Sequence, residues 1–180
     1  MDRVTKKPRL ATVWLGGCSG CHMSFLDLDE RLVDLAGRVE LCASPLTDLK
    51  EFAEADITLV EGAVANQEHL ESIYEIRKRS KILVSLGDCA VTGNVTAMRN
   101  IFSVDDVLNR AYKELATVVV GIPSGNGVVP KLLPRVKPVH EVVKVDYYLP
   151  GCPPSADAIH ACLLDLLDGR EPTGETKRFG

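Results

Sequence analysis

The sequence predicts an α/β protein built around one mostly parallel β-sheet of five strands. Apolar runs rich in β-branched residues alternate with helical patterns along most of the chain. Parallel strands need crossover connections, usually helices, and these crossovers are right-handed. The expected architecture is therefore a three-layer α/β/α domain of the flavodoxin-like kind. The expected strands are Leu10–Leu15, Val39–Ala43, Ile57–Val60, Ile82–Leu86 and Val142–Leu149.

Helical patterns fill most of the intervals between these strands. Ser155 is a suitable N-cap for the last helix, because apolar residues follow it at helical spacing. Residues 118–138 contain four prolines and a Gly-Asn-Gly tract, which predict an irregular insertion on the surface or at an interface. A short polar tail is expected over residues 168–180. The expected helices are Met23–Leu35, Asn66–Arg79, Val104–Leu115 and Ser155–Leu167.

Length, charge and hydropathy narrow the class of protein. A chain of 180 residues with 46% hydrophobic residues can fill one core, so we expect a single domain over residues 1–180. The net charge of -4 provides no basic surface for nucleic acid. Neither a transmembrane segment nor a signal-peptide core is predicted, so we expect a cytoplasmic protein. Six cysteines in that compartment are more often thiols or metal ligands than disulfides.

Four of the six cysteines follow predicted strands. Cys18 and Cys21 follow the first strand within Gly-Gly-Cys-Ser-Gly-Cys, Cys89 follows the fourth and Cys152 the fifth. The carboxyl ends of parallel strands share one edge, where such sheets carry their ligands, so these four thiols can converge. Iron-sulfur clusters need such a set of thiolates, and nearby glycines offer backbone N–H donors to sulfur. The sequence thus predicts a four-thiolate site.

The remaining two cysteines are not predicted to be ligands, and a dithiol and a zinc site are the alternatives to a cluster. Cys42 lies within a strand and Cys162 on the apolar face of the last helix, so both are expected to be buried small hydrophobes. A dithiol formed by Cys18 and Cys21 leaves the other two ligand candidates unexplained. Structural zinc usually takes its thiolates from two close pairs, whereas here one pair and two single cysteines come from three distant loops.

The motifs around these cysteines resemble the small subunits of nickel-iron hydrogenases. The resemblance runs through residues 9–167. It implies a flavodoxin-like fold, one 4Fe-4S cluster on Cys18, Cys21, Cys89 and Cys152, and a large partner subunit that holds nickel and iron. It is carried by Trp-Leu-Gly-Gly-Cys-Ser-Gly-Cys at residues 14–21, Val-Glu-Gly-Ala-Val at 60–64, Gly-Asp-Cys-Ala at 87–90 and Pro-Gly-Cys-Pro-Pro at 150–154.

Two differences between this chain and other hydrogenase small subunits narrow the expected subtype. Membrane-bound and periplasmic members of that family have a leader and a C-terminal extension with further cysteines, and neither is found here. The chain therefore looks like the small subunit of the bidirectional, NAD-linked cytoplasmic enzymes, with an iron-sulfur and flavin diaphorase module as electron acceptor. The rival is the 20 kDa-type cluster-bearing subunit of NADH:quinone oxidoreductase. That family has two adjacent cysteines at its first motif, whereas Cys18 and Cys21 are separated by two residues.

Further cofactor and catalytic roles remain open from the sequence. Glu61 follows the third strand at the same edge, where it can relay protons if burial raises its pKa, or can cap a helix. His22 is expected in the second layer around the cluster or on the surface. FMN is a further option for this fold, although the first loop, where a phosphate would bind, is occupied by cysteines.

Overall fold

Five parallel strands form the central sheet, as the sequence predicts. The structure is a computed structural model that describes residues 6–49, 51–115, 117, 121–125 and 127–173. The strand order is β2-β1-β3-β5-β7, and every pairing is parallel. When the five strands of this sheet are numbered in chain order, their order in the sheet is 2-1-3-4-5, which is the flavodoxin-like order. The strands are β1 (Arg9–Trp14), β2 (Glu40–Ala43), β3 (Ala55–Glu61), β5 (Ser80–Leu86) and β7 (Tyr147–Leu149).

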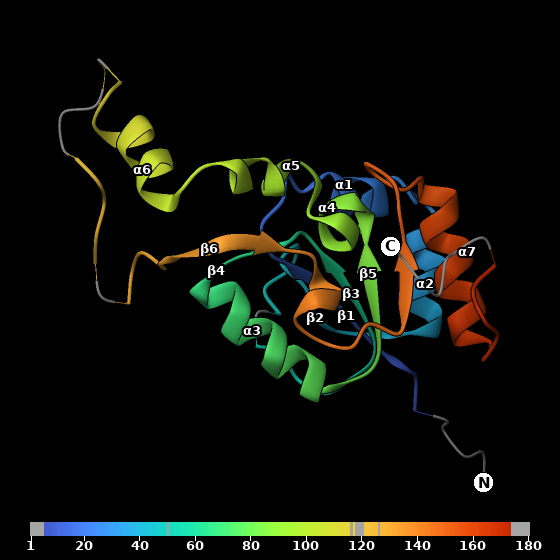
Figure 1. Cartoon of the computed structure of the whole chain (residues 1–180). Helices are drawn as coiled ribbons and strands as arrows, with labels where there is room; N and C mark the ends of the chain where they lie inside the picture. The colour runs from blue at the N-terminus through green and yellow to red at the C-terminus, as the bar shows by residue number, and fades with distance from the viewer. Residues whose placement is uncertain (1–5, 50, 116, 118–120, 126, 174–180) are drawn as a thin grey trace, which may run out of the picture.

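Two core clusters occupy the two faces of the sheet and make the molecule three-layered (Figure 1). On one face, α1 (Gly20–Leu26), α2 (Arg31–Arg38) and α7 (Ala156–Leu167) pack with residues such as Leu59, Leu86 and Leu163. On the other face, α3 (Gln67–Lys78) and the 3-10 turn η2 (Val139–Glu141) cover Val60 and Leu83.

Side-chain caps explain where two of the predicted helices begin. Asn66 accepts a hydrogen bond from the amide of His69 at the start of α3, and Ser155 accepts one from the amide of Ala158 at the start of α7. The predicted third helix is α6 (Val104–Tyr112), capped by Ser103. It stands away from the sheet in Figure 1, and none of its residues is buried.

The predicted helix Met23–Leu35 is wrong as a single element. The chain forms α1 and α2 instead, separated by a turn in which Asp29 has φ 50°. No glycine or proline marks this break in the sequence. The predicted last strand is also too long, because Val142 to Val145 continue from η2 and only Tyr147–Leu149 pairs with β5.

The insertion near residues 118–138 is only partly irregular. It contains β6 (Leu132–Lys137), which pairs antiparallel with β4 (Val64–Asn66) in a second, two-stranded sheet. The sequence does not predict this strand because it contains Pro134. Proline has no backbone N–H for the hydrogen bonds between strands and is tolerated mainly in edge strands. Residues 118–120 and 126, and 174–180 of the expected tail, lie outside the described residues.

Between β5 and β6 the chain forms short helical turns. These are α4 (Gly87–Thr92), α5 (Asn94–Ala97) and the 3-10 turn η1 (Met98–Ile101), none of which the sequence analysis predicted. Because α4 starts directly at the carboxyl end of β5, it carries Cys89 at the sheet edge. No helix of the described residues has the length and apolar character that crossing a membrane requires.

Candidate iron-sulfur site

The four predicted ligands all lie at the carboxyl edge of the sheet. Cys18 lies between β1 and α1, and Cys21 is the second residue of α1. Cys89 lies in α4 directly after β5, and Cys152 follows β7. All four are free thiols. Cys18 and Cys152 are exposed, Cys89 is half-buried and Cys21 is 7% exposed, so the group extends from the core to the surface.

Gly87 brings the loop after β5 into contact with Cys21. Gly87 has φ +79°, and a Cβ atom built at this position would lie 2.2 Å from Cys21 Sγ. That separation is far shorter than any non-bonded contact, so only glycine fits here. The thiol of Cys21 therefore lies directly against the backbone that carries Cys89.

Hydrogen bonds join the three cysteine loops to one another. The amide of Asp88 donates to the carbonyl of Gly151 over 2.9 Å, and Asp88 Oδ1 accepts from the amide of Gly151 over 2.8 Å. Ser24 Oγ on α1 donates to the carbonyl of Pro154 over 2.6 Å. The loops that carry Cys89 and Cys152 are thus paired, and the helix that carries Cys21 is fastened to the same unit.

The electrostatics of Cys21 indicate that the four sulfurs are neighbours. Burial raises the pKa of the Cys21 thiol most, and the nearby charges of Glu61, Cys89, Cys18 and Cys152 raise it further. The Asn94 side chain donates to Cys152 Sγ over 3.4 Å, a contact that favours a negatively charged sulfur. A set of four convergent thiols with such a donor fits an iron-sulfur cluster, whose positive metals stabilise thiolate ligands.

Zinc and an iron-sulfur cluster differ in how they would bind four thiolates. Zinc requires all of its thiolates about 2.3 Å from a single point.

Glu61 lies beneath the first cysteine loop, and its environment corrects one expectation. Its side chain is 1% exposed and accepts hydrogen bonds from the amides of Cys21 and His22 and from His22 Nδ1. Burial raises the pKa of Glu61, but the hydrogen bonds and charge of His22 outweigh this effect and hold the pKa below its usual range. The expectation of a raised pKa is therefore wrong.

His22 is a buried neighbour of this site, not a surface residue. It is 1% exposed, and its ring lies 5.2 Å from the ring of Trp14. The sequence does not predict the contact between His22 and Glu61, because the two residues lie far apart in the chain. Their meeting depends on the register in which Trp14 of β1 pairs with Glu61 of β3.

The two remaining cysteines lie away from this edge of the sheet or inside the core. Cys42 in β2 is 9% exposed, and its thiol donates to the carbonyl of Leu10. Cys162 is 2% exposed and packs in the core cluster under α7. Both occupy the buried positions expected from the sequence.

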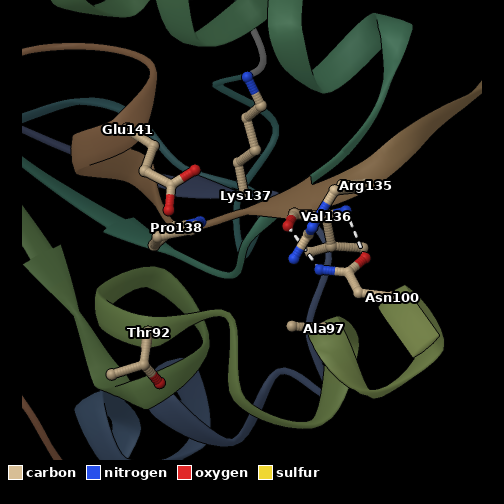
Figure 2. A pocket seen from close by; sticks show the side chains of 8 residues that line it. All are labelled: Thr92, Ala97, Asn100, Arg135, Val136, Lys137, Pro138 and Glu141. Atoms are coloured by element: carbon tan, nitrogen blue, oxygen red, sulfur yellow. Dashed lines mark hydrogen bonds between the residues drawn. The ribbon is translucent and has the colours of Figure 1, made fainter.

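Two of the cavities that described residues line contain none of the four cysteines. One of about 580 Å³ lies between α4, α5 and β6, where the Asn100 side chain exchanges two hydrogen bonds with the backbone of Val136 (Figure 2). The other, of about 570 Å³, lies beside the carboxyl end of β1. Its wall includes Glu68, Glu71 and Glu75, whose negative charges oppose a flavin phosphate. This cavity therefore does not support the prediction that FMN binds to the chain.

Comparison with known proteins shows the family to which this chain belongs. Residues 18–166 match the family described as NADH ubiquinone oxidoreductase, 20 Kd subunit. The chain is 46% identical over 168 residues to the delta subunit of the NAD-reducing hydrogenase HoxS of Cupriavidus necator, covering 91% of this chain and 80% of that protein. It is 37% identical to a protein of the F420-non-reducing hydrogenase of Methanothermobacter thermautotrophicus, covering 93% of this chain but only 56% of that protein.

Solved structures of hydrogenases are also similar to this chain. A chain of an NAD+-reducing [NiFe]-hydrogenase in the H2-reduced state has a TM-score of 0.89 and 45% identity, covering 97% of this chain and 96% of that chain. A [NiFeSe]-hydrogenase chain of Dm. baculatum, with a TM-score of 0.59 and 19% identity, shares the fold.

The chain therefore belongs to the family of the 20 kDa subunit of NADH:ubiquinone oxidoreductase, within its branch of hydrogenase small subunits. The resemblance seen in the sequence is confirmed, and so is the three-layer fold. The hydrogenase interpretation is favoured over the quinone-oxidoreductase alternative, because the similarity to the NAD-reducing hydrogenase extends over nearly the whole of both chains.

Proposed function

We propose that this chain is the small electron-transfer subunit of an NAD-linked nickel-iron hydrogenase and holds one 4Fe-4S cluster through Cys18, Cys21, Cys89 and Cys152. The observation that carries the proposal is the joined set of cysteine loops at the sheet edge. It occurs in a chain that is 46% identical to a subunit of an NAD-reducing hydrogenase.

The protein's own groups determine how the site works. An iron-sulfur cluster, when bound, takes up and releases single electrons. Cys21 anchors the site to the core, whereas Cys18 and Cys152 face outward, where a partner can approach. The Asn94 side chain stabilises negative charge on Cys152, and hydrogen bonds to ligand sulfur raise the potential of such sites.

The proposal includes two kinds of partner. A large subunit holds the nickel and iron that split hydrogen, and diaphorase iron-sulfur and flavin subunits accept the electrons for transfer to NAD+. Exposed apolar side chains next to the site support a covering partner: Val95, Met98 and Ile101 are 62%, 69% and 82% exposed and follow Asn94 in the chain. We place this complex in the cytoplasm.

Hydrogen-dependent reduction of NAD+ by the assembled complex tests the proposal. Cys89→Ser should abolish this activity, whereas Cys162→Ser, which changes a buried thiol in the core, should retain it. Equal activity of the Cys89→Ser complex and the wild type would remove the cluster from the electron path. A flavin extracted from the isolated chain would restore the FMN option.

A proton-relay role for Glu61 remains a separate prediction. The lowered pKa of Glu61 favours an acceptor that stays ionised, so a relay needs help from its neighbour His22. Glu61→Gln tests the relay: a loss of hydrogen turnover with an unaltered cluster supports it, and unchanged turnover with an intact cluster removes it.

A further inference from the structure

The helix that carries Cys21 lacks a cap of its own. At its start, Ser19 is in the left-handed region with φ 72° and makes no side-chain capping hydrogen bond. Gly20, Cys21 and His22 are then the first three helical residues. The amides of the second and third residues of a helix normally bond to the side chain of the N-cap residue. Here those two amides belong to Cys21 and to His22.

Glu61 supplies the missing cap from a different strand. Its Oε1 accepts from the Cys21 amide over 3.3 Å, and its Oε2 accepts from the His22 amide over 2.9 Å. A carboxylate at this end also interacts favourably with the helix dipole. Because Glu61 ends β3, these bonds tie the start of α1 directly to the central sheet.

His22 holds this carboxylate in place. Its Nδ1 bonds to the same Oε2 that accepts from its own amide. Its other ring nitrogen, Nε2, is buried and has no hydrogen-bond partner among the residues that the structure describes. The ring therefore directs its one polar contact toward Glu61, while Trp14 packs against it.

We infer that Glu61 is a positioning residue for the iron-sulfur site, acting as a remote helix cap that fixes Cys21, with His22 orienting the cap. The inference rests on the proposed function. A buried carboxylate is costly unless it is fully hydrogen-bonded, and all of the Glu61 hydrogen bonds given above go to Cys21 and His22. Fixing the Cys21 backbone helps to keep its thiol against Gly87, where a Cβ atom would lie 2.2 Å from Cys21 Sγ.

The test follows the stability and the electronic structure of the cluster in the full chain, isolated without oxygen. The first readout is the rate at which an iron chelator bleaches the visible absorbance, and the second is the electron paramagnetic resonance spectrum of the reduced cluster. Glu61→Gln keeps the size of the side chain but turns an acceptor into an N–H donor facing a backbone amide. We expect bleaching roughly tenfold faster, in line with the loss of one hydrogen bond to a charged group, together with shifted g values.

Two further variants test the role of His22. His22→Leu should accelerate bleaching as Glu61→Gln does, because it removes the side-chain donor to Oε2. His22→Asn restores a donor near the position of Nδ1 and should bring the rate back toward that of the wild type. Asp165→Asn is the matched control: Asp165 is a buried carboxylate that accepts from the amide of Thr173 and from Arg170, far along α7, and both readouts should stay at wild-type values.

The outcomes separate the inference from the proposed function. A wild-type chain without iron and sulfide would overturn the proposed function itself. A wild-type cluster with the same bleaching rate and spectrum in Glu61→Gln would overturn only the positioning role. If Glu61→Gln fails to fold, the His22 variants decide, since equal rates for His22→Leu and the wild type contradict the inference.

Discussion

At the scale of single residues, the site depends on one position that accepts only glycine. Gly87→Ala would place a methyl group 2.2 Å from Cys21 Sγ at a backbone φ of +79°. We expect this variant to lose most of its iron and sulfide. Gly169→Ala is the matched control, because Gly169 has φ +71° but no atom within 4 Å of the added carbon. Full iron content in Gly87→Ala would show that the loops are not packed as described.

Asn94 allows a test of the electronic environment of Cys152. Replacing Asn94 by glycine removes the donor to Cys152 Sγ and suits the local φ of 32°. Because N–H donors stabilise the reduced, more negative state, the midpoint potential should fall, on the order of tens of millivolts for one hydrogen bond. A redox titration of the wild type and the variant measures this difference. An unchanged or higher potential speaks against the contact.

The sequence predicts best those features whose chemistry is tied to a position along a strand. Four cysteines differ from Cys42 and Cys162 because they follow strand ends, which share one edge, and the structure agrees with that placement. The ionisation of Glu61 could not be predicted in this way. Its burial alone indicates a raised pKa, and only the three-dimensional contact with His22 reverses the direction.

At the scale of elements, regular amphipathic patterns and caps are sufficient to predict α3 and α7, whereas the short elements lack such patterns. The break between α1 and α2 has no glycine or proline, and β6 contains Pro134. Such elements are fixed by tertiary contacts: Val136 of β6 is 3% exposed, and its backbone bonds to Asn100. Local sequence carries little of that information.

The paired loops after β5 and β7 give a prediction at this scale. Asp88→Ala removes the acceptor for the Gly151 amide and leaves that amide unpaired. An unpaired donor costs about 1–3 kcal/mol when it is fully buried, and the Gly151 amide is half-buried, so the cluster should bleach a few-fold faster with an iron chelator. Asp88→Asn retains an acceptor oxygen and should behave nearly as the wild type. Equal bleaching rates for the alanine and asparagine variants would show that this hydrogen bond does not contribute to the stability of the site.

The core beneath α7 gives a second prediction for an element. Leu163 is 1% exposed and packs between α7 and the sheet. Leu163→Ala should lower the free energy of unfolding by about 2–5 kcal/mol, through lost burial and the cavity left behind. Val33 on α2 is 75% exposed, so Val33→Ala should change stability by no more than about 0.5 kcal/mol. Urea unfolding of both variants checks the difference, and a loss below about 1 kcal/mol for Leu163→Ala would argue against this packing.

At the scale of the whole molecule, a parallel sheet collects distant cysteines at one edge while its two faces are filled by separate cores. The 4Fe-4S assignment on Cys18, Cys21, Cys89 and Cys152 remains the central proposal. It requires that these four thiols act as a group and that Cys42 and Cys162 do not take part.

Iron and acid-labile sulfide per full chain, isolated without oxygen, test that proposal most directly. The wild type, Cys42→Ser and Cys162→Ser should each contain about four irons and about four sulfides. Serine at position 18, 21, 89 or 152 should remove most of both. Zinc without sulfide in the wild type, or full iron and sulfide in the Cys89→Ser and Cys152→Ser variants, would contradict the four-cysteine site.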